Sequence, residues 1–443
     1  MRVDSGALRV IETLRAAGYR ALLAGGCVRD LLMGREPRDW DIATDAAPDQ
    51  VEKLFERTLP VGAHFGISVV VLESGQYEVA RFRRDGPYRD GRHPTFVEAA
   101  DEWADAQRRD FTINGLFFDP STDELIDHVG GQADIKRGIL RAIGDPTDRF
   151  REDYVRLLRC IRFAARFNFS IESETYSALS ALAQHIQMTA PERIDDELTR
   201  LLTEGGVVRG LELLMDSGLL NVLLPEVAAL RGVEQPPEYH PEGDVWTHLL
   251  LVMGQLRNPD PELAWGALLH DIGKEPTFEI RDRIRFNRHD YVGAHMALGI
   301  CRRLRMSNAR TDRICDLVAQ HMRICNVRDM RESKRRRFLR QEGFDQLLEL
   351  HRADCMGCHG KLDLYQFCQA ELSALGPEGL NPPPLLTGRD LMALGLPPGP
   401  LMGRVLTRLE DAQLEGAIQS RAEAIRWVQQ RYRASLIEDR KSE

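Results

Sequence analysis

Leu23-Ala24-Gly25-Gly26-Cys27-Val28-Arg29-Asp30-Leu31-Leu32, followed a few residues later by Arg38-Asp39-Trp40-Asp41-Ile42, is the part of the sequence that decides the fold. The first stretch predicts a strand that ends in two glycines and passes into a helix. Because glycine has no side chain, this backbone can approach a phosphate closely. Arg29 would lie in the first turns of the helix, where it could hold a triphosphate. A glycine pair by itself is equally compatible with a plain tight turn.

Asp39 and Asp41 make the phosphate interpretation stronger. Residues two apart in a strand point to the same face, so the two carboxylates would converge while Trp40 points away. Paired carboxylates repel each other unless a cation lies between them, and hard oxygen ligands suit Mg²⁺. Such an ion can activate an attacking hydroxyl and stabilise a departing pyrophosphate. The alternative is two solvated acids on an edge strand.

Length and composition limit the class of protein. A chain of 443 residues predicts two to four domains, and 43% hydrophobic with 29% charged residues is typical of a soluble globular protein. No apolar run approaches the roughly 18 residues of a membrane-spanning helix. The charged first twenty residues lack a signal-peptide core. Eight unevenly spaced cysteines predict a reduced, cytoplasmic setting and no disulfide framework.

Strand signals occupy the first third of the chain and then nearly vanish. We expect a helix over 8–17, a strand over 19–24 and a hairpin of 67–72 with 76–82. Apolar residues then recur at helical spacing, interrupted by two proline-rich segments. We therefore expect an α+β fold, in which a small head of mixed sheet and helices precedes an elongated all-helical remainder. The expected domains are the head (1–146), a helical neck (147–232), a second helical domain (240–375) and C-terminal helices (386–443).

The glycine turn and the Asp39-Trp40-Asp41 pair resemble the signature of the DNA polymerase β-like nucleotidyltransferases. More narrowly, they resemble the class II group that contains bacterial CCA-adding enzymes and poly(A) polymerases. Three further blocks are similar to motifs of this group, in the right order: 108–116, 152–159, and 191–194 with Glu197-Leu198. Gly115 departs from the pattern, where alanine is usual, but this difference should not disturb the chemistry.

The resemblance implies a role for each matching residue. Asp39 and Asp41 would hold Mg²⁺ as the catalytic pair, and Asp153 with Arg156 would read the nucleobase in place of a template. The residues implied to contact the nucleotide are Gly26, Arg29, Arg109, Asp110, Asp153, Arg156, Arg159 and Arg162.

The row of arginines can also be argued from spacing alone. Arg156, Arg159, Arg162 and Arg166 follow at three- and four-residue steps, so they share one face of a predicted helix. Four cations on one face repel unless an anion or a row of acceptors lies opposite. An Asp–Arg pair can offer a base its hydrogen-bonding complement. The alternative is a salt-bridged face turned to solvent.

The segment 81–94 is rich in Gly, Pro, Asp and Arg and predicts a basic loop. It resembles the family's flexible loop, which is thought to help switch specificity from C to A. This favours a complete CCA-adding activity over a CC-only one.

The second helical block carries a candidate metal site. His248 lies in one predicted helix and His270-Asp271 ends another, where buried polar groups would need a partner. The pattern resembles the HD phosphohydrolase superfamily, in which a distal Asp, best matched here by Asp354, completes the ligands. His289, His295 and His321 could complete a second metal position. A second divalent transition metal is therefore expected here.

Cys355-Met356-Gly357-Cys358-His359 matches the pattern of covalent c-type haem attachment. That attachment requires export, which nothing in the sequence directs, so we expect no haem. A zinc site is also not expected, because no second paired cluster lies at suitable spacing.

Charge is distributed unevenly along the chain, which has a net charge of −9. Residues 301–340 carry thirteen Lys or Arg against four acids, a local excess of +9. Such a stretch could bind the phosphates of an RNA. A solvated helix face explains the charge equally well.

These features together predict a CCA-adding nucleotidyltransferase that transfers C, C and A from CTP and ATP to a tRNA 3′ end. The alternatives are an A-adding enzyme or a poly(A) polymerase with the same head, or an HD phosphohydrolase as the main activity. A poly(A) polymerase is mildly disfavoured because the C-terminus offers only Arg440-Lys441 and no extended basic tail. The exact specificity, the HD metal and substrate, and the oligomeric state do not follow from the sequence.

Overall fold

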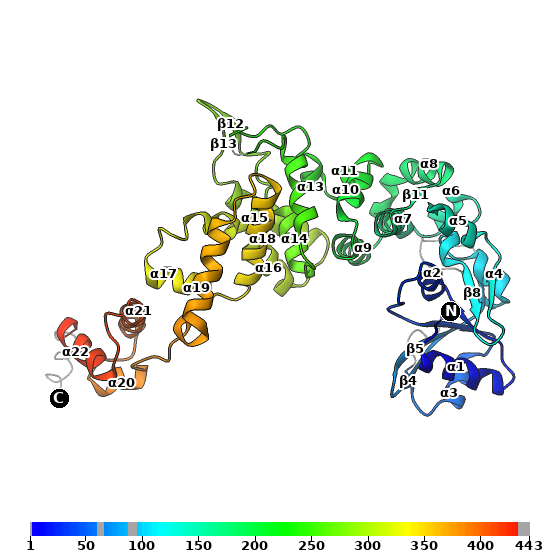
Figure 1. The fold of residues 1–443 in the computed structure, drawn as a ribbon, viewed down its shortest axis with the longest axis horizontal. Coiled ribbons are helices and arrows are strands. Elements are labelled where there is room, and N and C mark those ends of the chain that lie inside the picture. Colours follow the sequence, from blue (N-terminus) through cyan, green and yellow to red (C-terminus); the bar gives the residue numbers. More distant parts are fainter. Residues whose placement is uncertain (1, 60–65, 87–94, 239, 433–443) are drawn as a thin grey trace. The chain divides into compact units, whose positions relative to one another are not determined.

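The structure is a computed structural model that describes residues 2–59, 66–86, 95–238 and 240–432 (Figure 1). The chain forms two compact units. The first contains residues 1–229 together with 299–308, and the second contains 230–298 and the chain from 309 onward. The expected borders at 146 and 386 stay predictions. No helix in the described parts of the chain is long and apolar enough to cross a membrane.

A seven-stranded mixed sheet forms the base of the first unit, in the order β3-β4-β5-β2-β1-β8-β9. The β2–β5 pair is parallel and every other pair in the sheet is antiparallel. The strands are β1 (Ala21–Ala24), β2 (Asp41–Thr44), β3 (Thr58–Leu59), β4 (Ile67–Leu72), β5 (Gly75–Arg81), β8 (Leu116–Asp119) and β9 (Glu124–Asp127).

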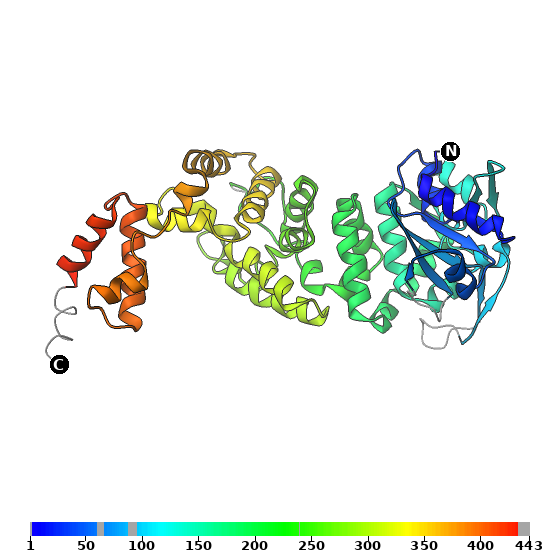
Figure 2. The ribbon, with the colours of Figure 1, turned by 90° about the horizontal axis from the view of Figure 1, so that it is seen from below.

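Alternating side chains bury both faces of this sheet. Leu23 faces the core formed with α1 (Ser5–Ala16) and α3 (Pro48–Leu54), whereas Leu22 faces a second cluster with Ala106 of α4 (Glu102–Gln107). Figures 1 and 2 show α1, in blue, lying against the sheet. The strand edge thereby brings β1, β2 and the helix α2 (Gly26–Leu32) together at one end.

The expected helix at 8–17, strand at 19–24 and hairpin at 67–82 are confirmed within a few residues at each end. One expectation was wrong. Asp39 and Asp41 do not both lie within a strand, because β2 begins at Asp41, where pairing with Glu78 of β5 starts. Asp39 lies in the bend that leads into β2.

Helices follow the sheet within the same unit. Helix α7 (Val155–Phe167) carries the row of arginines and packs against α9 (Pro191–Thr203) and α10 (Val207–Asp216), and its apolar side chains are buried. The remaining elements of this unit are the ribbon of β6 (Arg83–Asp85) and β7 (Val97–Ala99), the pair β10 (Ile139–Leu140) and β11 (Ser170–Ile171), and the helices α5 (Gly131–Arg137), α6 (Pro146–Glu152), α7 (Val155–Phe167), α8 (Ser173–Ala181), α9 (Pro191–Thr203), α10 (Val207–Asp216), α11 (Leu219–Leu223) and α12 (Pro225–Ala228).

The second unit is helical apart from one short ribbon of β12 (Phe278–Ile280) and β13 (Ile284–Phe286) among its described residues. Its last three helices share a small core of their own. The helices are α13 (Val245–Gln255), α14 (Pro261–Leu269), α15 (His289–Arg303), whose last turns belong to the first unit, α16 (Asn308–Gln320), α17 (Glu332–Leu339), α18 (Phe344–Gly357), α19 (Asp363–Leu380), α20 (Gly388–Ala393), α21 (Pro400–Leu414) and α22 (Arg421–Arg431).

The basic stretch 301–340 is largely neutralised by the chain's own carboxylates. Ten of its thirteen cations have a carboxylate oxygen within ion-pair distance. On α17, Arg337 pairs with Glu410 and Asp411 of α21, and Arg340 pairs with the same Glu410. Much of the excess that the sequence shows is therefore used to join helices, which favours the alternative to RNA binding for this stretch.

Candidate active site

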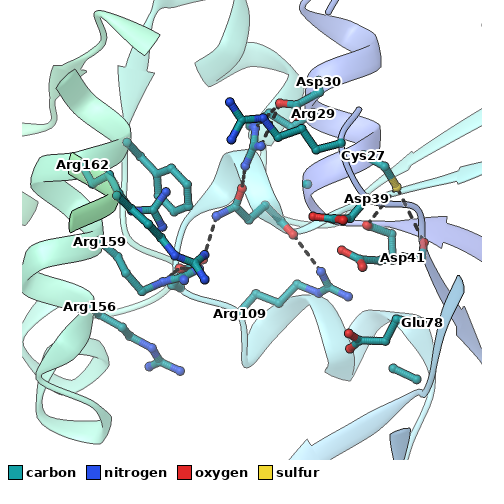
Figure 3. Close-up of a pocket in the computed structure, with 18 of the residues that line it drawn as sticks. Cys27, Arg29, Asp30, Asp39, Asp41, Glu78, Arg109, Arg156, Arg159 and Arg162 are labelled. Atoms are coloured by element: carbon teal, nitrogen blue, oxygen red, sulfur yellow. Dashed lines mark hydrogen bonds and ion pairs between the residues drawn. The ribbon is translucent and has the colours of Figure 1, made fainter. Parts of the chain in front are cut away.

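A polar cavity of about 820 Å³ lies in the first unit, between the sheet end and helices α7 and α9. All ten residues that the sequence predicts for the nucleotide site line this cavity. Figure 3 labels seven of them: Arg29, Asp39, Asp41, Arg109, Arg156, Arg159 and Arg162. The ten residues come from β2 and its leading bend, α2, the segment after α4, the C-terminal end of α6, and α7. The cavity thus collects residues that are more than 120 positions apart in the sequence.

Three carboxylates meet at the sheet end of the cavity. Asp39 and Asp41 point to the same side, and Glu78 of β5 lies next to them (Figure 3), whereas Trp40 packs against the core. Burial raises the pKa of Asp41 to about 6; the neighbouring Glu78 and Asp39 act in the same direction, while Arg109 opposes the shift. Three acids that repel one another fit a divalent cation, since an ion would offset this repulsion.

The glycine turn before α2 allows an arginine to reach the carboxylates. Gly25 has φ +70°, and a Cβ at this position would lie 2.5 Å from Nη1 of Arg109. Arg109 is held by two bonds to Asp105 (3.0 and 3.1 Å) and donates to the carbonyl of Asn114 (3.1 Å). These bonds fix the Arg109 guanidinium near Asp41. It fits there because residue 25 is a glycine and has no side chain in its way.

Arg29 is buried and already has partners. Its Nε donates to Asp30 (2.9 Å), its Nη1 donates to Asn114 Oδ1 (2.6 Å), and the guanidinium lies 4.6 Å from the ring centre of Phe167. These contacts fix the orientation of the side chain at the wall of the cavity.

Asp110 joins the head to α7. One oxygen accepts from Asn114 (3.0 Å) and from the backbone N–H of Phe111 (2.8 Å), and the other accepts from Nε of Arg159 (2.8 Å). The Arg159 guanidinium holds the pKa of this buried carboxyl well below its usual range, against the effect of burial. Through these bonds Asp110 links the segment after α4 to helix α7.

The acceptors opposite the arginine row are the chain's own. Arg162 donates to Glu197 (2.7 Å) and Glu204 (3.1 Å), and Arg166 donates to the same Glu204 (3.0 Å). Arg156 donates to Glu152 and to two backbone carbonyls. The repulsion expected along α7 is therefore relieved by three acids: Glu152 of α6, Glu197 of α9, and Glu204, which follows α9.

Asp153 forms its ion pair with Arg193, and not with its near neighbour Arg156. Its two oxygens instead accept from Nη1 and Nη2 of Arg193 on α9, at 2.9 and 2.7 Å. The carboxylate is thereby oriented toward the cavity, which Arg193 also lines.

Sequence reasoning missed Glu78, Asn114 and Arg193 as individual contributors. Glu78 carries a usable signal, since it is an acid flanked by the buried Tyr77 and Val79 in a predicted strand. Asn114 and Arg193 both lie inside blocks that resemble the family, but each also bonds a residue of another block, Arg29 and Asp153 respectively. Residues 87–94 of the expected basic loop lie outside the described residues. The loop's flanks form the β6–β7 ribbon, whose Arg83 N–H donates to Asp105.

A second cluster lies among the helices of the second unit. Nε2 of His248 is 3.0 Å from Asp354 Oδ1, and Nε2 of His270 is 3.2 Å from Asp271 Oδ2. His289 and His321 approach the other oxygen of Asp271, at 3.5 and 3.8 Å. The four predicted HD ligands thus come together, and His289 and His321 join them.

His295 does not join this cluster. Its Nδ1 hydrogen-bonds the carbonyl of Tyr291, and the side chain is exposed. It lies on the outer face of α15, six residues after His289, so the two side chains diverge. The expectation that His295 could serve as a ligand was wrong.

Family models match the chain in four consecutive parts. They are the poly A polymerase head domain (21–141), the RNA- and SrmB-binding site of polymerase A (168–230), the HD domain (244–347) and tRNA nucleotidyltransferase domain 2 (381–428). The order is that expected from the motifs. Part by part, the chain is similar to the tRNA nucleotidyltransferase and poly(A) polymerase family. Its members depend on divalent metal ions.

Curated relatives match about half of this chain. A CCA-adding enzyme of Geobacillus kaustophilus is 42% identical over 226 residues, which is 50% of this chain and 55% of that protein. Poly(A) polymerase I of Haemophilus influenzae is 37% identical over 50% of this chain and 52% of its own length. The chain therefore matches about half the length of these relatives.

Solved structures extend the likeness to the whole chain. The CCA-adding enzyme of Bacillus stearothermophilus in complex with CTP has a TM-score of 0.73 at 25% identity and covers 97% of both chains. The Thermotoga maritima CCA-adding enzyme complexed with tRNA has a TM-score of 0.59 at 19% identity and shares the fold over 96% of both chains. These likenesses in fold cover 96 to 97% of this chain.

Proposed function

We propose that this protein is a CCA-adding tRNA nucleotidyltransferase, which transfers C, C and A from CTP and ATP to a tRNA 3′ end with release of pyrophosphate. The observation that carries the proposal is the single cavity that holds a carboxylate trio at one end and an Asp–Arg array at the other. The first can serve phosphoryl transfer and the second can serve base selection. The expected cellular location is the cytoplasm, in keeping with eight cysteines that are all free thiols.

In the proposed reaction, the terminal ribose hydroxyl attacks the α-phosphorus, the new O–P bond forms, and the bond to pyrophosphate breaks. Asp39 and Asp41 would hold Mg²⁺, which when bound supplies charge stabilisation for the hydroxyl and the leaving group. Arg109, fixed by Asp105, would balance charge on the triphosphate, while the bare backbone at Gly26 lets the phosphates come close. Arg29 and its partner Asn114 hold that wall of the cavity in place.

Base selection would occur at the α7 end of the cavity. Asp153, oriented by Arg193, is an acceptor, and Arg156 is a donor. Cytosine and adenine both present an exocyclic amino donor beside a ring acceptor, whereas uracil and guanine present a carbonyl there. Asp110, Arg159 and Arg162 would hold this array at a fixed distance from the carboxylates.

The full-length likeness to a CCA-adding enzyme with bound CTP supports CCA addition over the alternatives. Because a poly(A) polymerase shares the matched half of the chain, the test must separate product types. We would supply Mg²⁺ and tRNA transcripts that end before the CCA, after C or after CC, with CTP, ATP or both. CCA addition requires both nucleotides on the shortest transcript and yields three added residues. ATP addition confined to the CC-ending transcript would indicate an A-adding enzyme, and a long ladder with ATP alone would indicate poly(A) synthesis.

We propose as a second function that the HD cluster binds a divalent transition metal and supports phosphoester hydrolysis. The supporting observation is that ligand atoms of His248, His270 and Asp354 lie within 4.8 Å of one another, as do those of Asp271, His289 and His321. Imidazole and carboxylate together suit such a metal. Metal analysis after dialysis would find metal in the unmodified protein and much less in Asp271→Asn. Equal, near-zero content in both proteins would exclude the site.

A further inference from the structure

In all four histidines of the HD cluster, Nδ1 lies within hydrogen-bond distance of a protein oxygen, which orients the ring. In three of them Nδ1 lies within hydrogen-bond distance of a backbone carbonyl: His270 with Ala267 (2.7 Å), His289 with Phe286 (2.9 Å) and His321 with Val318 (2.7 Å). A carbonyl can only accept, so Nδ1 carries the proton in each ring. In the neutral imidazole the lone pair is then on Nε2, which faces the aspartates.

His248 shows the same arrangement with a different partner. Its Nδ1 lies 2.8 Å from Oε1 of Glu242, and its Nε2 lies 3.0 Å from Asp354. The His248 side chain has no exposed surface, and only 7% of that of Glu242 is exposed. The same Glu242 oxygen also lies 2.9 Å from Nδ1 of His240.

Glu242 is itself held in place by the turn before α13. Two residues later, Asp244 caps α13 through the N–H of Thr247 (2.8 Å) and also accepts from the N–H of Gly232 (2.6 Å). The carboxylate therefore sits on an anchored segment, directly behind the ring of His248 as seen from Asp354.

These contacts leave two candidate ligand sets that share His248. One is His248 with His270 and Asp354, and the other is His240 with Glu242 and His248. The second set would need the Nδ1 protons of both His240 and His248 to leave, because those nitrogens face Glu242. The first set uses nitrogens whose lone pairs already face one another.

We propose that Glu242 is a positioning residue of the HD metal centre, and not a ligand: it fixes the tautomer and direction of His248 so that Nε2 binds a divalent cation on the Asp354 side. This inference rests on the proposed metal site and specifies how it is built. A carboxylate behind a ligating histidine also makes the ring a stronger donor. Removal of such a partner typically weakens metal binding by about 10- to 100-fold.

The test is a titration of the metal-free full-length protein with Co²⁺, followed by calorimetry and by visible absorption, which reports the coordination of the bound ion. Glu242→Gln keeps the shape of the side chain but removes its charge, and should weaken Co²⁺ binding about tenfold with the same final spectrum. Glu242→Ala should weaken it further. Asp354→Ala should change the spectrum and the affinity together, because a ligand is lost.

His240→Gln is the matched control, since His240 contacts the same oxygen of Glu242 but belongs only to the rejected ligand set. It should bind Co²⁺ as the unmodified protein does. Unchanged affinity in both Glu242 variants would overturn the positioning role, and loss of binding in His240→Gln with retention in Asp354→Ala would place the ion on the other set. If the unmodified protein binds no Co²⁺, the metal site itself fails. Retained nucleotide transfer and an unchanged melting temperature would verify that each variant is folded.

Discussion

At the scale of single residues, the charged form of Asp41, a candidate catalytic group, lowers the stability of the folded protein. Its carboxyl is mostly surrounded by protein, and two other acids, Glu78 and Asp39, add to the penalty. The proximity of Arg109 reduces the penalty but does not remove it. A divalent cation therefore stabilises a buried carboxylate beside other acids more than it would stabilise a solvated one.

The pKa of Asp41 sets the sign of a stability effect. The folded-state pKa of about 6 lies above the ordinary 3.8, so the folded chain binds the proton more readily and its stability falls as pH rises through this window. Without Mg²⁺, Asp41→Asn should therefore raise the melting temperature by a few degrees at pH 7.5, and the gain should shrink toward pH 4. Thermal melts at several pH values in a chelator would measure this. A lower melting temperature at pH 7.5 would contradict the account.

The same residue should be essential for chemistry. Asp41→Ala should reduce nucleotide transfer by at least about a thousandfold while tRNA binding survives, because the change removes a metal ligand and leaves the rest of the cavity. Single-turnover gels and a filter-binding assay would measure the two properties. Asp49→Asn, at an exposed helical ion pair with Lys53, is the control and should behave as the unmodified protein. Persistent transfer by Asp41→Ala would refute the metal role.

At the scale of elements, the base-reading array depends on how α7 packs against α9. Asp153 lies just before α7, and the arginine that orients it belongs to α9. Two more bonds from Arg162 to Glu197 and Glu204 hold α7 to α9 and the turn after it. The orientation of the proposed base reader is therefore a property of the helix pair.

Arg193→Gln tests this coupling. Loss of a forked charge-assisted pair worth about 1.5–3 kcal/mol should reduce kcat/KM for CTP and ATP by about 10- to 100-fold, and discrimination against UTP should narrow. Steady-state kinetics with each nucleotide would measure both effects. Arg303→Gln is a matched control, because Arg303 makes the same forked contact with Glu226 (2.8 and 2.9 Å) outside the cavity. Equal kinetics in the two variants would contradict a role for Arg193.

The sequence predicted secondary-structure elements better than it predicted which side chains form ion pairs with one another. Alternation and spacing located the 67–82 hairpin and the arginine face of α7, since both depend on short-range periodicity. Asp153 has a neighbour of opposite charge at Arg156, yet it pairs with Arg193, forty residues away. Likewise, the charge excess of 301–340 is visible in the sequence, whereas its neutralisation by Glu410 and Asp411 requires the fold.

At the scale of the whole molecule, the two candidate sites lie in different compact units. The nucleotide cavity is lined by residues 24–204 and the HD cluster by residues 240–354, so neither shares a residue with the other. Asp271→Asn should therefore remove metal from the HD cluster while leaving the rate of CCA addition within about twofold. Metal analysis and the extension assay on the same preparation would show this. A large loss of CCA addition would mean that the HD cluster serves the transfer reaction.

The measurement that tests the central claim most directly is the sequence of the added 3′ end. The protein would receive a tRNA transcript that lacks CCA, Mg²⁺ and all four nucleoside triphosphates at equal concentration, and the products would be sequenced. If the cavity itself selects the base, nearly all products should end in CCA and stop there. Products with frequent U or G would contradict selection by the Asp153 array, and long A tracts would contradict CCA addition in favour of poly(A) synthesis.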